Sequence, residues 1–293
     1  MSTDRTDPSP RSAILLVHCR DQQGLVAAIT EFIARNGGNI LSLEQHVDPL
    51  AGEFFMRVQW SLAGFAIPDE RIAEFFRVLI ADRYSMTYRV HFSDERLRMA
   101  LFVSKTSHCL HDILARVQSG ELHVDVPFIA SNHMDLEPVA RAAGIPFEYF
   151  AVGKDNRAEI EAAQVELVRR HAVDLVVLAR YMIILGEEFI RALPERVINI
   201  HHAFLPAFIG ARPYHRAYER GVKLIGATAH YVTGDLDEGP IIDQSVERVS
   251  HALGPDDYVS VGRDIESRTL ARAVKYHFEH RVLLNGRKTV IFG

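Results

Sequence analysis

The sequence has 293 residues, a formal net charge of -5 and 48% hydrophobic residues. Its length exceeds that of a typical single domain, and its composition is that of a globular protein rather than a disordered chain. The acidic balance excludes the basic surface that a nucleic-acid or membrane partner needs, so we expect neither partner. Two cysteines, Cys19 and Cys109, are too few for a disulfide framework. We therefore predict a cytoplasmic protein.

The N-terminal part of the chain is predicted to contain a polar, disordered tail over residues 1–10 and a first domain over residues 11–92. Apolar residues recur there at helical or alternating spacing. In chain order they predict a strand at 13–17, a helix at 25–33, strands at 39–47 and 54–60, a helix at 72–80 and a strand at 86–92. This βαββαβ order is typical of a ferredoxin-like fold, in which two helices cover a four-stranded antiparallel sheet.

This first domain resembles an ACT domain, a regulatory module that often binds amino acids where two such domains meet. The resemblance rests on His18-Cys-Arg-Asp21, Gly24-Leu-Val26 and Asn36-Gly-Gly-Asn-Ile40. It implies glycine or methionine as effectors, bound where backbone N–H groups at a helix start meet a carboxylate. The residues expected there are Asp21, Gly24, Asn39 and Ile40. The alternative is a module that only packs or makes an oligomer contact.

A charged linker is predicted at residues 93–98, followed by a second domain over residues 99–293. Strands are expected at 99–103, 124–129, 147–152, 174–178, 198–200, 225–232 and 241–246. The helices are expected at 110–117, 136–143 and 156–170, and over most of 255–284. Apolar strands alternating with helices predict a Rossmann-like, mostly parallel sheet, whose ligands bind beyond the carboxyl ends of its strands.

Polar residues gather between residues 197 and 244, at such a strand end. Asn199 and His201 share one side of a predicted strand because side chains alternate along it. An amide and an imidazolium can stabilise an oxyanion, and the carboxylate of Asp237 can pair with the imidazole and hold water. We predict these three residues to be catalytic in acyl chemistry. We expect no metal, because the histidines lack a third ligand at familiar spacing.

Blander interpretations exist for single members of this set. A lone buried histidine is usually a satisfied core group, and Cys109 is better explained as a buried residue than as a nucleophile. His202 and His215 are weaker candidates, expected to line the site. The combination of Asn199, His201 and Asp237 is what favours chemistry over packing.

The motif residues resemble the folate-dependent formyltransferase fold, whose catalytic asparagine, histidine and aspartate match Asn199, His201 and Asp237. The resemblance carries no separate cofactor, because the tetrahydrofolate derivative is itself the substrate. It implies substrate contacts from the segment after the predicted strand 174–178, from the loop before Asp237 and from two further histidines. Those residues are Arg180, Tyr181, Met182, Ile183, Leu185, His202, His230, Val232, Gly234 and Asp235.

The formyl acceptor is predicted from the loop Ser104–Leu110. In glycinamide ribonucleotide formyltransferases the corresponding loop is rich in glycine and holds a phosphate, whereas this loop contains none. That difference favours water. The whole arrangement resembles the formyltetrahydrofolate deformylase family, with departures at Ala203 and Gly234. The resemblance implies hydrolysis of 10-formyltetrahydrofolate to formate and tetrahydrofolate. This reaction would supply formate to purine synthesis and balance one-carbon pools.

Two other functions stay open, namely formyl transfer to an amine and a non-catalytic folate or amino-acid sensor. Because ACT modules commonly pair, we also expect a homo-oligomer, either a dimer or a tetramer.

Overall fold

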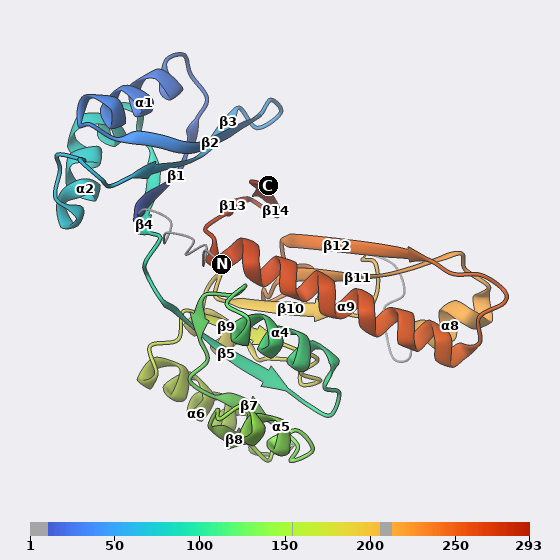
Figure 1. The fold of residues 1–293 in the computed structure, drawn as a ribbon. Coiled ribbons are helices and arrows are strands. Elements are labelled where there is room, and N and C mark those ends of the chain that lie inside the picture. Colours follow the sequence, from blue (N-terminus) through green and yellow to red (C-terminus); the bar gives the residue numbers. More distant parts are fainter. Residues whose placement is uncertain (1–10, 154, 206–212) are drawn as a thin grey trace, which may run out of the picture. The chain divides into compact units, whose positions relative to one another are not determined.

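The structure, a computed structural model, describes residues 11–153, 155–205 and 213–293. It contains two compact units (Figure 1). The first runs to Glu95 and includes His280–Asn285 and Val290–Gly293. The second comprises Arg96–Glu279 and Gly286–Thr289. Residues 280–285 and 290–293 thus belong to the first unit, whereas the sequence predicts them in the second domain. The predicted tail, residues 1–10, lies outside the described residues.

The first unit has the predicted βαββαβ order. Its strands are β1 Ser12–Arg20, β2 Asn39–Asp48, β3 Glu53–Ser61 and β4 Thr87–Phe92, and its helices are α1 Leu25–Arg35, α2 Asp69–Phe76, the π-helical η1 Arg77–Ala81 and α3 Asp82–Tyr84. The sheet order is β2-β3-β1-β4, and each neighbouring pair is antiparallel. The ferredoxin-like prediction is confirmed.

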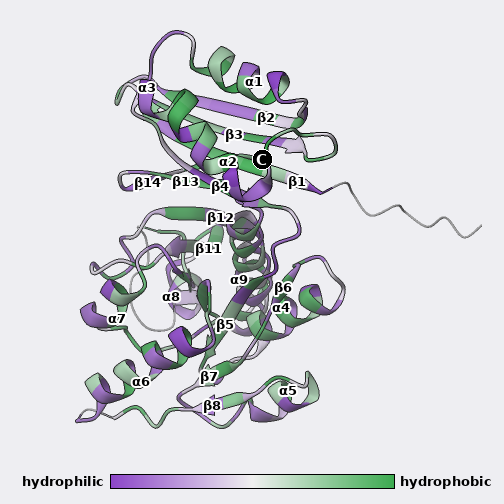
Figure 2. Ribbon diagram, turned by 90° about the vertical axis from the view of Figure 1, so that its left-hand side faces the viewer, coloured by the Kyte–Doolittle hydropathy of each residue, from purple (hydrophilic) through white to green (hydrophobic). Residues whose placement is uncertain are grey.

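Burial explains why these segments form this layer. Leu25, Ile29 and Ile33 recur at helical spacing on α1 and are all buried. They pack with alternating residues of β1 and β3 in one core that includes Trp60. Strand β2 lies at the edge of the sheet and has one buried residue, whereas seven of the nine residues of β3 are buried, although both strands mix hydrophilic and hydrophobic residues (Figure 2).

The second unit alternates strands and helices. Its strands are β5 Leu97–Val103, β6 Val124–Asp125, β7 Ile129–Ser131, β8 Phe147–Tyr149, β9 Leu175–Leu178, β10 Val197–His201, β11 Leu224–Tyr231 and β12 Ile241–Arg248. Its helices are α4 His108–Gln118, α5 Glu137–Ala142, α6 Arg157–Arg170, α7 Glu187–Ala192, α8 Pro213–Arg220 and α9 Pro255–Phe278. The sheet order is β12-β11-β10-β9-β5-β7-β8, with β6 beside β5.

This sheet is parallel from β10 to β8 and antiparallel at β11 and β12. The predicted Rossmann-like, mostly parallel sheet is confirmed. Alternate residues of β5, including Phe102, pack with α6 and α7 in one core. Helices α4 and α9 pack against each other beside the sheet, with α9 running along β11 and β12 (Figure 1).

One predicted strand is wrong. The strand expected at 124–129 is two short strands, because Pro127 has no N–H to continue the ladder. The helix expected over most of 255–284 is confirmed as α9, which ends at Phe278, and His280 then takes the left-handed conformation. A hairpin follows, with strands β13 Val282–Asn285 and β14 Lys288–Ile291 joined through Gly286, whose φ of 59° suits a tight turn. None of the helices in the described ranges is sufficiently long and apolar to span a bilayer.

Candidate active site

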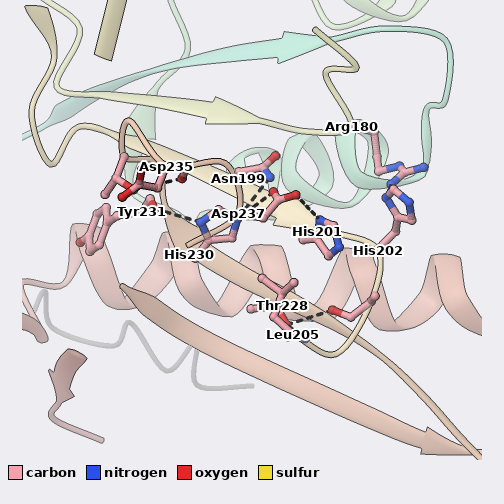
Figure 3. Close-up of polar contacts among 12 residues, drawn as sticks. Arg180, Asn199, His201, His202, Leu205, Thr228, His230, Tyr231, Asp235 and Asp237 are labelled. Carbon is pink, nitrogen blue, oxygen red and sulfur yellow. Dashed lines mark hydrogen bonds and ion pairs between the residues drawn. The ribbon is translucent and has the colours of Figure 1, made fainter. Parts of the chain in front are cut away.

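The site begins at the carboxyl end of β10. Asn199 and His201 are two residues apart on this strand, so they lie on the same side of it. The antiparallel register places Asn199 directly opposite His230 of β11, and the amide Nδ2 lies 3.3 Å from His230 Nε2. Figure 3 shows these side chains together, with Asp237 between the two histidines.

Asp237 comes from the loop between β11 and β12. Its φ of 56° lies in the left-handed region that favours glycine, so the surrounding loop must hold it there. The base of the loop is closed by a hydrogen bond of 2.9 Å from Tyr231 N to Pro240 O. A Cβ added at Gly239 would lie only 1.7 Å from the Tyr231 carbonyl oxygen. The loop can therefore reach this position only with glycine there.

Asp237 binds both histidines. Its Oδ2 lies 3.2 Å from His201 Nδ1 and its Oδ1 lies 3.6 Å from His230 Nε2. Hydrogen bonding from His201 first, and from His230 second, lowers the pKa of the Asp237 carboxyl well below its ordinary value, against the opposing effect of burial. The group is therefore a carboxylate at neutral pH.

This lowered pKa predicts a pH-dependent contribution to stability. A carboxyl with a lower pKa in the folded state stabilises the protein above its unfolded pKa, near 3.8, and that contribution is lost as the pH falls through the folded pKa. We expect the wild type to lose more unfolding free energy than Asp237→Asn between about pH 5 and about pH 3. Urea unfolding at both pH values measures this loss of unfolding free energy. Equal losses in the two proteins would contradict the pairing of Asp237 with the histidines.

The contacts assign the protons on the two imidazoles. His201 Nδ1 donates to the carboxylate, and its buried Nε2 has no hydrogen-bond partner among the described residues. His230 Nδ1 lies 2.9 Å from the Tyr231 carbonyl, which can only accept, so Nδ1 carries hydrogen. In the neutral ring, His230 Nε2 then accepts from Asn199, and in the protonated ring the same nitrogen donates to Asp237. The buried Nε2 of His201 is thus the group left to meet a substrate.

The predicted substrate segment follows β9. Its backbone is held by Ser104, which accepts from Met182 N at 2.9 Å, and by the buried Glu161, which accepts from Gly186 N at 3.0 Å. The side chain of Met182 is exposed, whereas Leu185 and Tyr181 are buried and Ile183 packs at the edge of the same core. The Tyr181 hydroxyl receives a hydrogen bond from Gln164. Of these side chains, Met182 is the one available to contact a ligand.

The remaining predicted residues fall into two groups. His202 stacks on His201, with ring centroids 5.1 Å apart, and Arg180 donates to it. Val232, Gly234 and Asp235 form the loop before Asp237, where Val232 N donates to Val197 O and the Asp235 carbonyl accepts from Thr233. His215 lies on α8 and is half-buried.

The four expected effector residues lie in two separate pairs within one chain. Asp21 and Gly24 follow the carboxyl end of β1, whose last residue pairs with Glu53. Asn39 pairs with Ser61, level with the start of β1, and Ile40 comes next. The two pairs therefore lie at opposite ends of the sheet, because β1 and β2 run parallel with β3 between them.

Glu266 and its two neighbours His108 and Tyr214 are not among the site residues predicted from the sequence. Glu266 is 1% exposed and accepts hydrogen bonds of 2.7 Å from both. A detectable signal existed, because Glu266 stands four residues from Gly262 and from Leu270 on the buried side of α9. A charged residue at a buried helical position requires a partner.

Comparison with known proteins agrees with this geometry. A model of the formyl transferase family matches residues 97–274, and a model of the ACT domain matches residues 13–74. A formyltetrahydrofolate deformylase of Synechocystis sp. is 50% identical over 281 residues, covering 96% of this chain and 98% of that protein. The chain belongs to the formyltetrahydrofolate deformylase family.

Two further relatives extend this result. The formyltetrahydrofolate deformylase of Bacillus subtilis is 47% identical and covers 95% of this chain and 93% of its own. The crystal structure of a formyltetrahydrofolate deformylase from Pseudomonas syringae pv. tomato has a TM-score of 0.94 and 43% identity, and the match covers 97% of this chain and 95% of that one. The predicted family, the ACT and formyltransferase organisation and the assignment as an enzyme are confirmed for this member of the deformylase family.

Proposed function

We propose that the protein hydrolyses 10-formyltetrahydrofolate to formate and tetrahydrofolate. The observation that carries the proposal is the assembly of Asn199, His201 and Asp237 at one strand end, in a chain of the deformylase family. The folate derivative is the substrate, so no further cofactor is required.

The reaction starts from a water molecule placed beside the Asp237 carboxylate. The water oxygen attacks the formyl carbon, and the carboxylate aids removal of its proton. The formyl oxygen becomes an oxyanion, which the Nε2–H of a protonated His201 stabilises. Asn199 adds the second hydrogen of its amide, because an amide nitrogen carries two and His230 takes one. The carbon–nitrogen bond then breaks, and His201 gives a proton to the departing folate nitrogen.

The loop Ser104–Leu110, from which the formyl acceptor is predicted, makes hydrogen bonds within the protein. Ser104 donates to Asn132 Oδ1 at 2.6 Å while accepting from Met182 N. His108, at the start of α4, binds the buried Glu266. These engaged side chains leave less of the loop to hold a phosphate-bearing amine, which supports water as the acceptor.

Formate release from 10-formyltetrahydrofolate, measured with and without glycinamide ribonucleotide, tests the proposal. Formate formation unaffected by the amine supports hydrolysis. Formylation of the amine would identify a transferase instead, and the absence of both products would indicate a folate sensor.

The loop glycine offers a specific prediction. Gly239→Ala should lower kcat by at least about tenfold, because the added Cβ displaces the loop from Tyr231 and moves Asp237 by an appreciable fraction of an ångström. Gly153→Ala is the matched control, since its Cβ would meet only Asn156 at an ordinary 3.4 Å. Steady-state formate release measures both. Equal kcat values would show that the loop tolerates the change.

Four further properties remain predictions. They are regulation by an effector, the supply of formate to purine synthesis with balancing of one-carbon pools, a cytoplasmic location, and assembly as a dimer or tetramer. The ACT domain supports an amino-acid effector. Calorimetric titration of the full-length protein with glycine and with methionine tests this, and no heat at millimolar ligand would count against both. Light scattering of the same sample gives the assembly.

A further inference from the structure

Arg180 connects His202, which stacks on the proposed catalytic His201, to the buried carboxylate of α9. Its Nη1 donates to His202 Nδ1, and its Nε lies 3.3 Å from Glu266 Oε2. Figure 3 shows the guanidinium beside the His202 ring. The backbone of Arg180 has a φ of 65°, in the left-handed region that non-glycine residues rarely adopt. Such a conformation persists only where the surroundings fix it, and it occurs often at functional sites.

Glu266 is the fixed end of this connection. Burial alone would raise the pKa of its carboxyl, but the hydrogen bond from His108 and the charge of Arg180 outweigh burial and lower it. Glu266 is therefore a carboxylate. Tyr214 adds a hydrogen bond, and burial raises the pKa of its hydroxyl so that it stays a donor. The Tyr214 ring lies where a Cβ on Gly262 would be, so the glycine gives it room on α9.

The contact with Arg180 determines the state of His202. A guanidinium has donors and no acceptor, and it does not lose its proton in proteins. His202 Nδ1 must therefore accept, which makes the ring neutral with its hydrogen on Nε2. Protonating Nδ1 would break this hydrogen bond and place a second positive charge against Arg180.

The state of His202 matters because its ring lies on that of His201, with planes only 17° apart. The titratable and charged groups that the described residues place around this pair include Asp237 beyond His201, Arg180 beside His202, and Glu266 and His108 behind Arg180. A charge on His202 would disfavour an imidazolium at His201.

We propose that Arg180 is a positioning residue which, anchored by Glu266, keeps His202 neutral and so allows His201 to carry the proton used in deformylation. The inference rests on the role proposed above for His201. It differs from the substrate contact expected for Arg180 from the sequence, because the guanidinium acts through His202.

The test is the pH dependence of kcat/KM for formate release, from about pH 5.5 to about pH 8.5, in the full-length protein. Arg180→Met should add an acidic ionisation near the ordinary histidine value of about 6.5. As the pH is lowered from about 8.5 to about 5.5, the kcat/KM of this variant should then fall at least about tenfold more than that of the wild type. Arg180→Met/His202→Gln should lose the added ionisation.

Arg157→Met is the matched control, because Arg157 binds the Ile184 carbonyl of the same segment without touching either histidine of the stacked pair. It should lower activity evenly at every pH. An equally pH-independent loss in Arg180→Met would overturn the proposal, since a purely structural role predicts that result.

Nitrogen-15 NMR of the histidine side chains gives a readout that needs no folded variant of Arg180. The His202 signal is assigned by its absence in His202→Gln. In the wild type it should show the neutral ring with hydrogen on Nε2 down to about pH 5.5, well below ordinary histidine protonation. Protonation of His202 at about pH 6.5 would overturn the inference whether or not formate is released. A neutral His202 in a protein that releases no formate would contradict the proposed function alone.

Discussion

Asp237→Asn is expected to lower kcat for formate release by about three orders of magnitude or more. The carboxylate receives His201 Nδ1 at 3.2 Å and also faces His230, so it orients one imidazole and stabilises its positive charge. The amide of asparagine has nearly the same shape but no charge, and it is a much weaker base for the attacking water. Binding of a folate ligand should change by less than about threefold, because the lost interactions act mainly in the transition state.

The control for this variant is Glu238→Gln, which removes the adjacent carboxylate. Glu238 is 59% exposed and pairs with Arg287, which is still more exposed, so the change should leave kcat within about twofold. Single-turnover formate release and equilibrium binding of tetrahydrofolate separate chemistry from affinity. Normal turnover in Asp237→Asn would remove Asp237 from the mechanism.

His201→Asn should lower kcat by about two to four orders of magnitude, the range typical of losing a general acid. Its Nε2 is buried and has no partner in the described part of the chain, so it is the donor placed to meet the formyl oxygen or the folate nitrogen. Asparagine cannot deliver a proton there. The loss should be smallest for a substrate with a better leaving group, because such a substrate needs less proton transfer.

The matched control is His171→Asn, at the C-terminal end of α6, where the ring contacts Phe128. It should alter stability slightly and kcat by less than about twofold. A similar decrease in both variants would point to general destabilisation. Turnover of His201→Asn within about threefold of the wild type would exclude His201 as the proton donor.

Periodicity predicted most of the fold. In the first unit, the strands have alternating apolar residues and α1 has the apolar stripe of Leu25, Ile29 and Ile33. This pattern predicts a sheet covered by helices, because each apolar face must pack against another. In the second unit, the run from Leu175 to Leu178 is apolar throughout, as a parallel strand buried on both faces must be. The error in the strands came where one residue interrupts a pattern, at Pro127.

The site was predicted less completely than the fold. Asn199 and His201 share a strand, so local spacing already places them together. Asp237 was grouped with them by its chemistry and by the family resemblance rather than by spacing, since its position depends on a loop closed from Tyr231 to Pro240. The predicted effector residues lie in two pairs within one chain, because one pair follows the end of β1 and the other begins β2, which runs parallel to β1.

By itself, the sequence determined the two folds and predicted Asn199, His201 and Asp237 as the candidate catalytic residues at one strand end. These predictions follow from local spacing and motifs. Only the tertiary structure decided which charged groups lie around the neighbouring His202. Glu266 lies 86 residues beyond Arg180, yet the packing of α9 brings its buried carboxylate to the guanidinium that binds His202. A buried charge interacts with whatever group the fold places beside it, and that neighbour is fixed by packing rather than by sequence distance.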